Sequence, residues 1–248
     1  MGLSKIVIVD STQNFIARQP LMNLCKKHRA TYVHHPADVH SPSTVRNQGM
    51  MAAIATGASY ALFVDVDVLG HRASVDRVRK DISDGLNFNW YPVMFTGPDD
   101  GIKRMKKWSN EPEDLYSGSL EQIGYATGIQ LLSVEAWQEL GGFDESFVGY
   151  GCEDIDMIHR ATLLFGNRSP ENSDSPYFED FRTTELNNYR GYRKWMRDKK
   201  SSVPRSEMWV HFHHRKHTDS KYYKARKRND ILLDKKMRQF DMQIAQRK

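Results

Sequence analysis

Cysteine is scarce in this chain of 248 residues. The two cysteines, Cys25 and Cys152, lie far apart and match no metal-binding or redox spacing. A disulfide framework therefore does not organise the fold. Long apolar runs are missing too, because none approaches the roughly 20 residues needed to cross a bilayer. The sequence thus predicts no membrane-spanning helix.

The N-terminal residues MGLSKIVIVDST contain only a short apolar stretch, which ends at Asp10. They lack the longer apolar region and the small-residue cleavage site of a secretory signal peptide. We therefore expect a cytoplasmic protein. Global disorder is excluded, because 39% of the residues are hydrophobic and 11% are aromatic. That content suffices for one large domain, or for one domain with an appendage.

Charge is unevenly distributed along the chain, although the net charge is only +5. Residues 190–248 contain 19 Lys or Arg and 6 Asp or Glu, whereas residues 1–189 contain 17 and 25. The sequence therefore describes an acidic body followed by a basic tail, and each part needs its own explanation.

Short apolar strands and helical segments alternate through the first 70 residues. We expect strands at residues 5–10, 30–34 and 60–68, and helices at residues 15–29 and from a cap at Ser43-Thr44 to about residue 57. Strands that are almost continuously apolar and alternate with helices are typical of a parallel α/β sheet.

The rest of the chain continues this pattern less regularly. We expect strands at residues 90–95, 127–133 and 209–214, helices at 76–84, 134–140, 153–165, 187–198 and 219–246, and loops at 97–118 and elsewhere within 166–206.

Two aspartates, Asp65 and Asp67, close the third predicted strand. Because side chains alternate along a strand, both would lie on one face. Ligands in open α/β sheets bind outside the carboxyl ends of the strands. Mg²⁺ or Mn²⁺, which binds carboxylates and substrate phosphates, would relieve the repulsion between them. A sugar hydroxyl is an alternative partner, and two solvated turn aspartates are the structural alternative.

Residues 141–156 combine glycines, aromatic side chains and acids. Glycine would allow the backbone to approach a ligand closely. Glu153 and Asp154 fall at a predicted helix start, where a carboxylate could accept a proton from a hydroxyl nucleophile. An acidic helix start after a loop would explain these acids, but not the interleaving of glycine and aromatic residues.

Histidines are concentrated in residues 209–217. His211 and His214 are three residues apart, and His211 and His213 alternate along the predicted strand, so either pair could offer imidazole nitrogen to a metal. A basic, partly exposed run is the alternative explanation for any one of these histidines.

These segments together resemble nucleotide-sugar glycosyltransferases of the GT-A fold, in particular the β-1,4-galactosyltransferases and the bacterial chondroitin-polymerase type. Four segments carry the resemblance: IVIVDST at residues 6–12, STVRNQG with the stretch to Asp67, residues 126–160 with the specific GGFDE block, and residues 211–214.

The resemblance implies a Rossmann-like α/β fold with a mostly parallel central sheet and a basic helical C-terminal extension. It predicts one domain at residues 1–218, with the donor half at about 1–95 and the acceptor half at about 96–218. A separate basic helix would follow at residues 219–248.

The resemblance also implies a metal-dependent inverting transfer from a nucleotide sugar, expected to be a UDP-sugar, to a hydroxyl acceptor. Asp154 would be the catalytic base. Acceptor or sugar contacts are expected at Glu153, Tyr150, Asp144 and Gly151; donor contacts at Asp10, Arg46 and Asp65; and Mn²⁺ or Mg²⁺ ligands at Asp67, His214 and His211.

Several positions depart from the family pattern. The resemblance implies an earlier strand before the segment that starts at Ile6, so we expect this sequence to begin at the family's second strand, and the resemblance does not define the base pocket. Tyr150 stands where tryptophan is usual, Cys152 replaces a glycine, and Ile155 replaces an acid. The identity of the acceptor therefore does not follow from the resemblance.

The basic tail interleaves rings with cations at residues 189–197 and 221–228. This composition suits nucleic acid or an anionic membrane surface, and a solvated helix face is the alternative. We expect the acceptor to be a bacterial or phage surface or capsular glycan, or alternatively a hydroxylated base in phage DNA. Asp67, Asp154 and His214 argue against a binding module that has lost activity.

Overall fold

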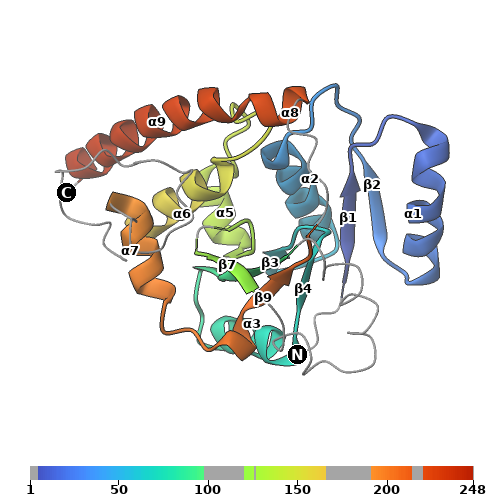
Figure 1. Cartoon of the computed structure of the whole chain (residues 1–248), viewed down its shortest axis with the longest axis horizontal. Coiled ribbons are helices and arrows are strands. Elements are labelled where there is room, and N and C mark those ends of the chain that lie inside the picture. Colours follow the sequence, from blue (N-terminus) through green and yellow to red (C-terminus); the bar gives the residue numbers. More distant parts are fainter. Residues whose placement is uncertain (1–4, 98–119, 126, 166–190, 214–219, 248) are drawn as a thin grey trace. The chain divides into compact units, whose positions relative to one another are not determined.

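The computed structural model describes residues 5–97, 120–125, 127–165, 191–213 and 220–247 (Figure 1). The chain forms two compact units, each assembled from separate stretches of sequence. The first contains residues 1–61, 132–160 and 217–240, and the second contains residues 62–131, 161–216 and 241–248. Most of the predicted basic helix at residues 219–248 therefore belongs to the same unit as the N-terminal residues.

The first unit contains a parallel pair of strands, β1 (Val7–Asp10) and β2 (Thr31–His34). Helix α1 (Phe15–Lys27) connects them, as a parallel crossover requires. Its first turn is capped by Asn14, whose side chain accepts hydrogen bonds from two backbone amides. Helix α1 packs against β2, and the next helix packs against both strands (Figure 1).

That next helix is α2 (Pro42–Ala55), and its cap differs from the prediction. The N-cap is Ser41, whose Oγ accepts from the Thr44 amide, and not Ser43-Thr44. Pro42 occupies the first helical position, where its fixed φ and missing N–H are favourable. Ser43 is instead fully buried inside the first turn.

The remaining helices of this unit come from distant parts of the sequence. They are α5 (Val134–Leu140), α6 (Glu153–Leu164), α8 (Lys221–Lys224) and α9 (Arg226–Arg247). Helix α5 ends at Gly141, which has a φ of 73° and supplies the left-handed cap that glycine favours. The single helix predicted for residues 219–246 is divided at Ala225 into α8 and α9.

The second unit contains a four-stranded sheet in the order β4-β9-β6-β7. Its strands are β4 (Val68–Gly70), β9 (Trp209–His211), β6 (Val93–Thr96) and β7 (Leu120–Gly124). Strand β9 runs antiparallel to β4 and parallel to β6, and β6 runs antiparallel to β7. The apolar core beside this sheet contains Met94, Met208, Val210 and Phe212. The unit also holds α3 (Arg72–Ser83), α7 (Gly191–Lys200) and a 3-10 turn at Arg205–Glu207.

A third sheet has the order β3-β8-β5, with β3 at Tyr60–Phe63, β8 at Gln130–Ser133 and β5 at Phe88–Trp90. Strands β3 and β8 each contain a position at which the chain passes from one unit to the other. No helix among the described residues is long and apolar enough to cross a membrane.

The predicted α/β class is confirmed, but the largest sheet is mixed rather than mostly parallel. Two predicted strands are also interrupted. The strand expected at residues 60–68 ends at Phe63 and resumes at Val68, because the intervening aspartates form a turn. The strand expected at residues 90–95 divides at Pro92, which cannot donate a ladder hydrogen bond.

Candidate functional site

The predicted site residues fall into two groups, one in each unit. The second unit holds Asp65, Asp67 and His211, and the first holds Asp10, Arg46, Asp144, Tyr150, Gly151, Glu153 and Asp154. The remaining predicted metal ligand, His214, lies outside the described residues.

Asp67 and His211 contact each other directly. Nε2 of His211 lies 3.1 Å from Oδ2 of Asp67, and both side chains are partly buried. The backbone holds them in place, because the Phe212 amide donates to the Asp67 carbonyl at 2.9 Å and Val68 pairs with His211 across β4 and β9. A carboxylate oxygen and an imidazole nitrogen therefore converge at the end of this strand pair.

Strand β6 supports the other side of His211. The rings of Phe95 and His211 lie 4.7 Å apart between centroids. The Thr96 hydroxyl donates to the His211 carbonyl at 3.3 Å and accepts from the His213 amide at 3.0 Å. These contacts fix the imidazole on a central strand, whereas the side chain of His213 is exposed.

Asp65 and Asp67 do not share a strand face, contrary to the prediction. Residues 64–67 leave the strand, and the Val68 amide donates to the Asp65 carbonyl at 3.1 Å, which closes a turn. Val66 at its tip is 97% exposed, and the Asp65 side chain is exposed too. The turn, not strand alternation, therefore decides the directions of the two carboxylates.

The pair formed by Asp67 and His211 fits two ligands of a divalent cation. Carboxylate oxygen suits Mn²⁺ and Mg²⁺, and imidazole is the commonest nitrogen ligand of protein-bound metals. No group of three or more His, Cys, Asp or Glu side chains able to hold a metal occurs among the described residues. Further ligands would have to come from the nucleotide diphosphate, from water or from residues such as His214.

In the first unit, Arg46 and Glu153 form a buried ion pair. Nη1 of Arg46 donates to Oε1 of Glu153 at 2.7 Å, and the side chains are 10% and 6% exposed. The resemblance implied a donor contact for Arg46 and an acceptor contact for Glu153, whereas the structure joins the two residues to each other. The Arg46 guanidinium also lies 5.5 Å from the Phe143 ring centroid.

Burial, followed by the negative charge of Asp154, raises the pKa of Glu153, and the Arg46 guanidinium offsets this only in part. Oε2 of Glu153 is buried and has no hydrogen-bond partner among the described residues. A buried carboxylate oxygen without a hydrogen-bond donor is costly. Asp154, the next residue, is only partly buried, and its Oδ1 accepts from the Ile155 amide at 2.8 Å.

Asp10 ends β1 and already has partners for both carboxylate oxygens. Oδ1 accepts from the Thr12 amide at 2.9 Å, and Oδ2 accepts from the Tyr32 hydroxyl at 2.7 Å. Burial alone would raise the pKa of Asp10, but these hydrogen bonds hold it below its usual value. The next residue, Ser11, has its hydroxyl 2.7 Å from Nδ1 of His40.

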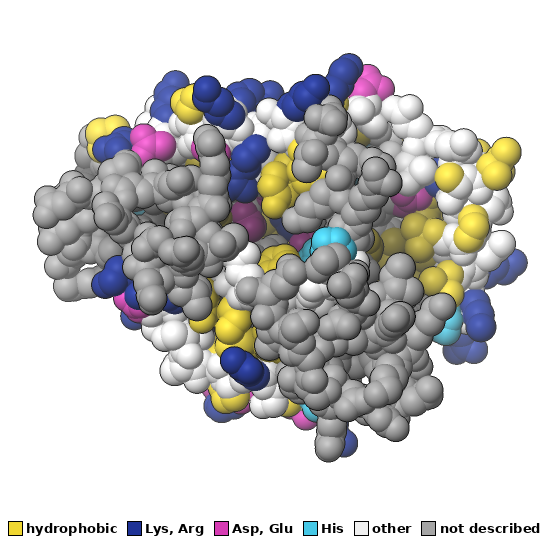
Figure 2. Space-filling view, viewed as in Figure 1, with side chains coloured by type: hydrophobic (Ala, Val, Ile, Leu, Met, Phe, Trp, Pro, Cys, Tyr) yellow, Lys and Arg dark blue, Asp and Glu magenta, His cyan; other side chains and the backbone are white. Residues whose placement is uncertain are grey.

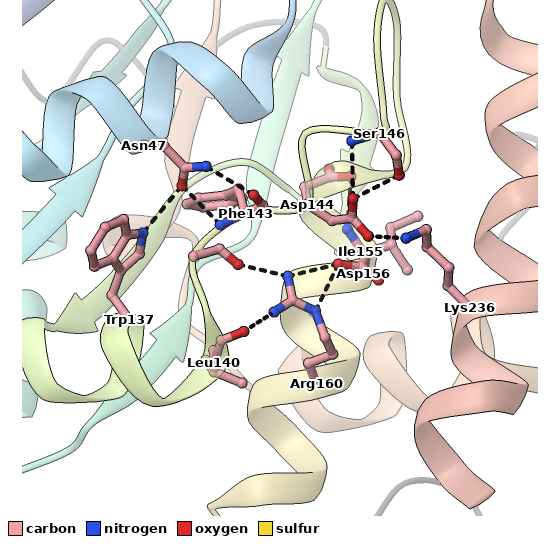
Figure 3. Close-up of polar contacts among 12 residues, drawn as sticks. Asn47, Trp137, Leu140, Phe143, Asp144, Ser146, Ile155, Asp156, Arg160 and Lys236 are labelled. Atoms are coloured by element: carbon pink, nitrogen blue, oxygen red, sulfur yellow. Dashed lines mark hydrogen bonds and ion pairs between the residues drawn. The ribbon is translucent and has the colours of Figure 1, made fainter. Parts of the chain in front are cut away.

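Asp144 connects the GGFDE segment to the C-terminal helix (Figure 3). Oδ1 accepts from the Ser146 amide and hydroxyl at 2.9 and 2.6 Å, and Oδ2 pairs with Lys236 of α9. Burial raises the pKa of Asp144, but the hydrogen bonds from Lys236 and Ser146 outweigh it and lower the pKa below its ordinary value. Its predicted role in acceptor binding stays a prediction.

Two further polar residues, neither of which was predicted to have a role, hold this segment (Figure 3). Arg160 pairs with Asp156 at 2.8 Å and donates to the carbonyls of Leu140 and Gly142 at 2.7 and 2.9 Å. The i,i+4 spacing of Asp156 and Arg160 on α6 is a signal that could have predicted this pair.

Asn47 is the second of these residues. Its Oδ1 accepts from the Phe143 amide at 2.8 Å, and its Nδ2 donates to the Phe143 carbonyl at 2.9 Å, so the side chain imitates a paired backbone (Figure 3). An asparagine inside a helix could have predicted this role, because asparagine is unfavourable there unless its side-chain amide forms hydrogen bonds.

The glycines before α6 allow the C-terminal helices to pack closely against the backbone. A Cβ at Gly149 would lie 2.6 Å from the Cβ of Ala225, and one at Gly151 would lie 2.5 Å from Nη1 of Arg226. Both glycines have positive φ, of 81° and 89°. A side chain at either position would therefore collide with α8 or α9, and the predicted acceptor contact at Gly151 stays a prediction.

Tyr150 packs against the same helices. Its ring lies 5.7 Å from the Tyr222 ring and 5.0 Å from the Tyr223 ring, and its amide donates to the Tyr222 carbonyl at 2.9 Å. Burial raises the pKa of its hydroxyl. Stacking of an acceptor on Tyr150 stays a prediction.

Comparison with known proteins connects this arrangement to sugar transfer. Residues 115–239 match the model of a family described as "Glycosyltransferase like family 2". The mouse chondroitin sulfate synthase 3 is 30% identical over 105 residues, and the human chondroitin sulfate synthase 3 is 29% identical over 106 residues. Each alignment covers 41% of this chain but only 12% of the relative.

The family match includes β7, β8, α5, the acidic start of α6 and most of the C-terminal helix. It spans half of the chain, and the predicted GT-A α/β fold and glycosyltransferase class agree with it. This chain therefore belongs to the glycosyltransferase-like family 2.

Proposed function

We propose that this chain is a metal-dependent inverting glycosyltransferase that moves a sugar from a UDP-sugar to a hydroxyl of a growing glycan. The observation that carries the proposal is the first turn of α6. There a buried carboxylate, Glu153, pairs with Arg46 through Oε1, while its Oε2 has no partner in the part of the chain that the structure describes, and the more accessible Asp154 is the next residue. Such a pair offers one carboxylate to orient a hydroxyl and a second to remove its proton.

In this mechanism Asp154 accepts the proton of the acceptor hydroxyl. The hydroxyl oxygen forms a bond to the anomeric carbon on the face opposite the diphosphate. The bond between that carbon and the diphosphate oxygen breaks, so the configuration inverts. Glu153 accepts a hydrogen bond from a sugar hydroxyl through Oε2, and Arg46 keeps Glu153 in place. Such positioning is worth several kcal/mol in enzymes in general.

Asp67 and His211 would hold Mn²⁺ or Mg²⁺, and the bound cation would neutralise the diphosphate of the leaving nucleotide. Asp10, at the end of β1, and Asp65, in the turn that follows β3, are the proposed donor contacts. The named relatives synthesise chondroitin sulfate, which supports a polysaccharide acceptor and the likeness to the chondroitin-polymerase branch.

The basic C-terminal face is the feature that would favour an anionic acceptor such as DNA. Figure 2 shows Lys and Arg side chains along the edge that α8 and α9 occupy, and the exposed lysines there are Lys221, Lys224, Lys227 and Lys235. Part of the positive charge of α9 is nevertheless paired, since Arg226 and Arg238 bind aspartates of the same helix. We therefore favour the glycan acceptor.

A screen of nucleotide sugars tests the proposal. The expected result is that one UDP-sugar raises the melting temperature only when Mn²⁺ or Mg²⁺ is present, and that the sugar is then transferred to an oligosaccharide. Stabilisation that is independent of metal would contradict the metal requirement. If the protein is retained on DNA at low salt and transfers sugar to DNA but not to oligosaccharides, the acceptor is nucleic acid and not a glycan.

A further inference from the structure

Residues 148–152, which we call the pre-acid loop, lead directly into Glu153 and Asp154. Three of its five residues have positive φ: Gly149 at 81°, Gly151 at 89° and Cys152 at 84°. Such conformations are costly for a residue that has a Cβ, and they persist only where surrounding contacts hold them. The pre-acid loop has no regular secondary structure, so its carbonyl groups need partners from elsewhere.

Asn229 of α9 supplies those partners. Its side chain is fully buried, and Nδ2 lies 3.2 Å from the carbonyl oxygen of Val148, 3.2 Å from that of Tyr150 and 3.1 Å from that of Gly151. An amide nitrogen has two protons, so the three carbonyls share two N–H groups. One side chain thus binds three of the five carbonyls of the pre-acid loop.

The neighbours of Asn229 extend this contact. Nη2 of Arg228 donates to the Val148 carbonyl at 2.9 Å. The Cys152 thiol donates to Oδ1 of Asp230 at 3.2 Å, and Nε of Arg226 donates to the same oxygen at 2.8 Å. Three consecutive residues of one helix, at positions 228–230, therefore contact the loop at both of its ends.

The pre-acid loop is also continuous with the first turn of α6. The Cys152 carbonyl accepts from the Asp156 amide at 2.9 Å, so the loop supplies the first hydrogen bond of the helix. Any shift of the loop would move the start of α6 and with it the carboxylates of Glu153 and Asp154. A displacement of about 1 Å at a reacting group can lower a rate 100-fold.

We propose that Asn229 is a positioning residue for sugar transfer, which holds the pre-acid loop so that Glu153 and Asp154 meet the acceptor correctly. The inference rests on the proposed function, because it assigns Asn229 an effect on that reaction. It also assigns α9 a role in positioning the pre-acid loop, which its basic composition did not suggest.

The test compares Asn229→Asp with Asp234→Asn. The first variant keeps the side-chain volume but removes the donor, and the second removes a partly exposed carboxylate that pairs with Arg238 on the same helix. For Asn229→Asp we expect kcat, per folded molecule and well below the melting temperature, to fall at least tenfold. KM for the nucleotide sugar should stay within twofold, and the pH profile of kcat should shift. Asp234→Asn should match the wild type.

A second variant covers the case in which Asn229→Asp does not fold. Arg228 is exposed, so Arg228→Met should fold, and the loss of its bond to Val148 should lower kcat about threefold with an altered pH profile. An active wild type with an unchanged kcat in the folded variants would overturn the inference alone. A wild type that transfers no sugar from any nucleotide sugar would overturn the proposed function and the inference together.

Discussion

Nη1 of Arg46 donates to Oε1 of Glu153 at 2.7 Å, which joins α2 to the first turn of α6 across 107 positions of the sequence. Removing one partner of a buried ion pair leaves an uncompensated charge, which generally costs about 3–5 kcal/mol. We therefore expect Arg46→Met to lower the free energy of unfolding by about 3 kcal/mol at pH 8. Urea denaturation followed by circular dichroism measures this change.

The same variant has a predicted pH dependence. Burial raises the pKa of Glu153 in the folded protein above its value in the unfolded chain. Ionisation of Glu153 therefore lowers the stability of the folded protein as the pH rises through that pKa. The deficit of Arg46→Met should therefore shrink as the pH falls towards 5, where Glu153 is protonated. The double variant Arg46→Met with Glu153→Met should recover most of the stability at pH 8. A deficit that is the same at both pH values would contradict an unpaired carboxylate as its cause.

Asp67 and His211 give a prediction about metal. Asp67→Ala and His211→Ala should each abolish or strongly weaken the Mn²⁺-dependent binding of the UDP-sugar, and EDTA should do the same to the wild type. Isothermal titration calorimetry with and without Mn²⁺ measures this. Asp76→Ala, on an exposed part of α3, is the control and should bind as the wild type does. Unchanged affinity in Asp67→Ala would remove it as a ligand.

Asp154→Asn tests the proposed base. The amide cannot accept the proton of the acceptor hydroxyl, so kcat should fall by about 100-fold or more, as for other general bases. Binding of the UDP-sugar with metal should be retained. The exposed substitution Glu139→Gln on α5 serves as the control for a lost carboxylate. Normal turnover by Asp154→Asn would show that another group removes the proton.

Two glycines of the first unit separate backbone strain from packing. Gly141 and Gly149 both have positive φ, but a Cβ meets nothing within 4 Å at Gly141 and meets Ala225 at 2.6 Å at Gly149. Gly141→Ala should cost about 1 kcal/mol through backbone strain alone. Gly149→Ala should cost about 1–3 kcal/mol more, because α8 and α9 must move away. If thermal unfolding shows the same loss of stability in both variants, α8 and α9 do not pack closely against Gly149.

Lys200 predicts a pH dependence in the second unit. Nζ donates to Oδ1 of Asn89 at 2.6 Å and lies 4.1 Å from the Trp90 ring, and burial lowers the pKa of Lys200 to about 7, although the charge of Asp81 opposes this. Between pH 7 and 10.5 the unfolded chain therefore binds more protons, and stability rises with pH. The slope contributed is at most about 1.4 kcal/mol per pH unit.

Chemical denaturation between pH 7 and 10 checks this slope. Lys200→Met should lose it, whereas the exposed neighbour Lys199→Met should keep the wild-type slope. If Lys200→Met and the wild type change in parallel with pH, Lys200 does not deprotonate in this range.

The sequence predicted the elements whose signals are local. Helices α1, α5 and α6 begin and end close to the expected residues, because caps, glycine stops and apolar periodicity act within a few residues. The placement of Glu153 and Asp154 at a helix start followed in the same way. The prediction of a continuous strand was wrong for residues 64–67, where the turn propensity of the aspartates outweighed the continuing apolar pattern.

The sequence by itself therefore determined the α/β class, most element positions and the acids of α6, since these depend on neighbouring residues. Only the tertiary structure decided that Arg46 pairs with Glu153, that Asp67 contacts His211, and that Asn229 binds the pre-acid loop. It also showed that the C-terminal helices pack against the backbone at Gly149 and Gly151, where a Cβ would collide with them. Hydrophobic periodicity records whether a position is buried, but it does not record which distant segment covers that position.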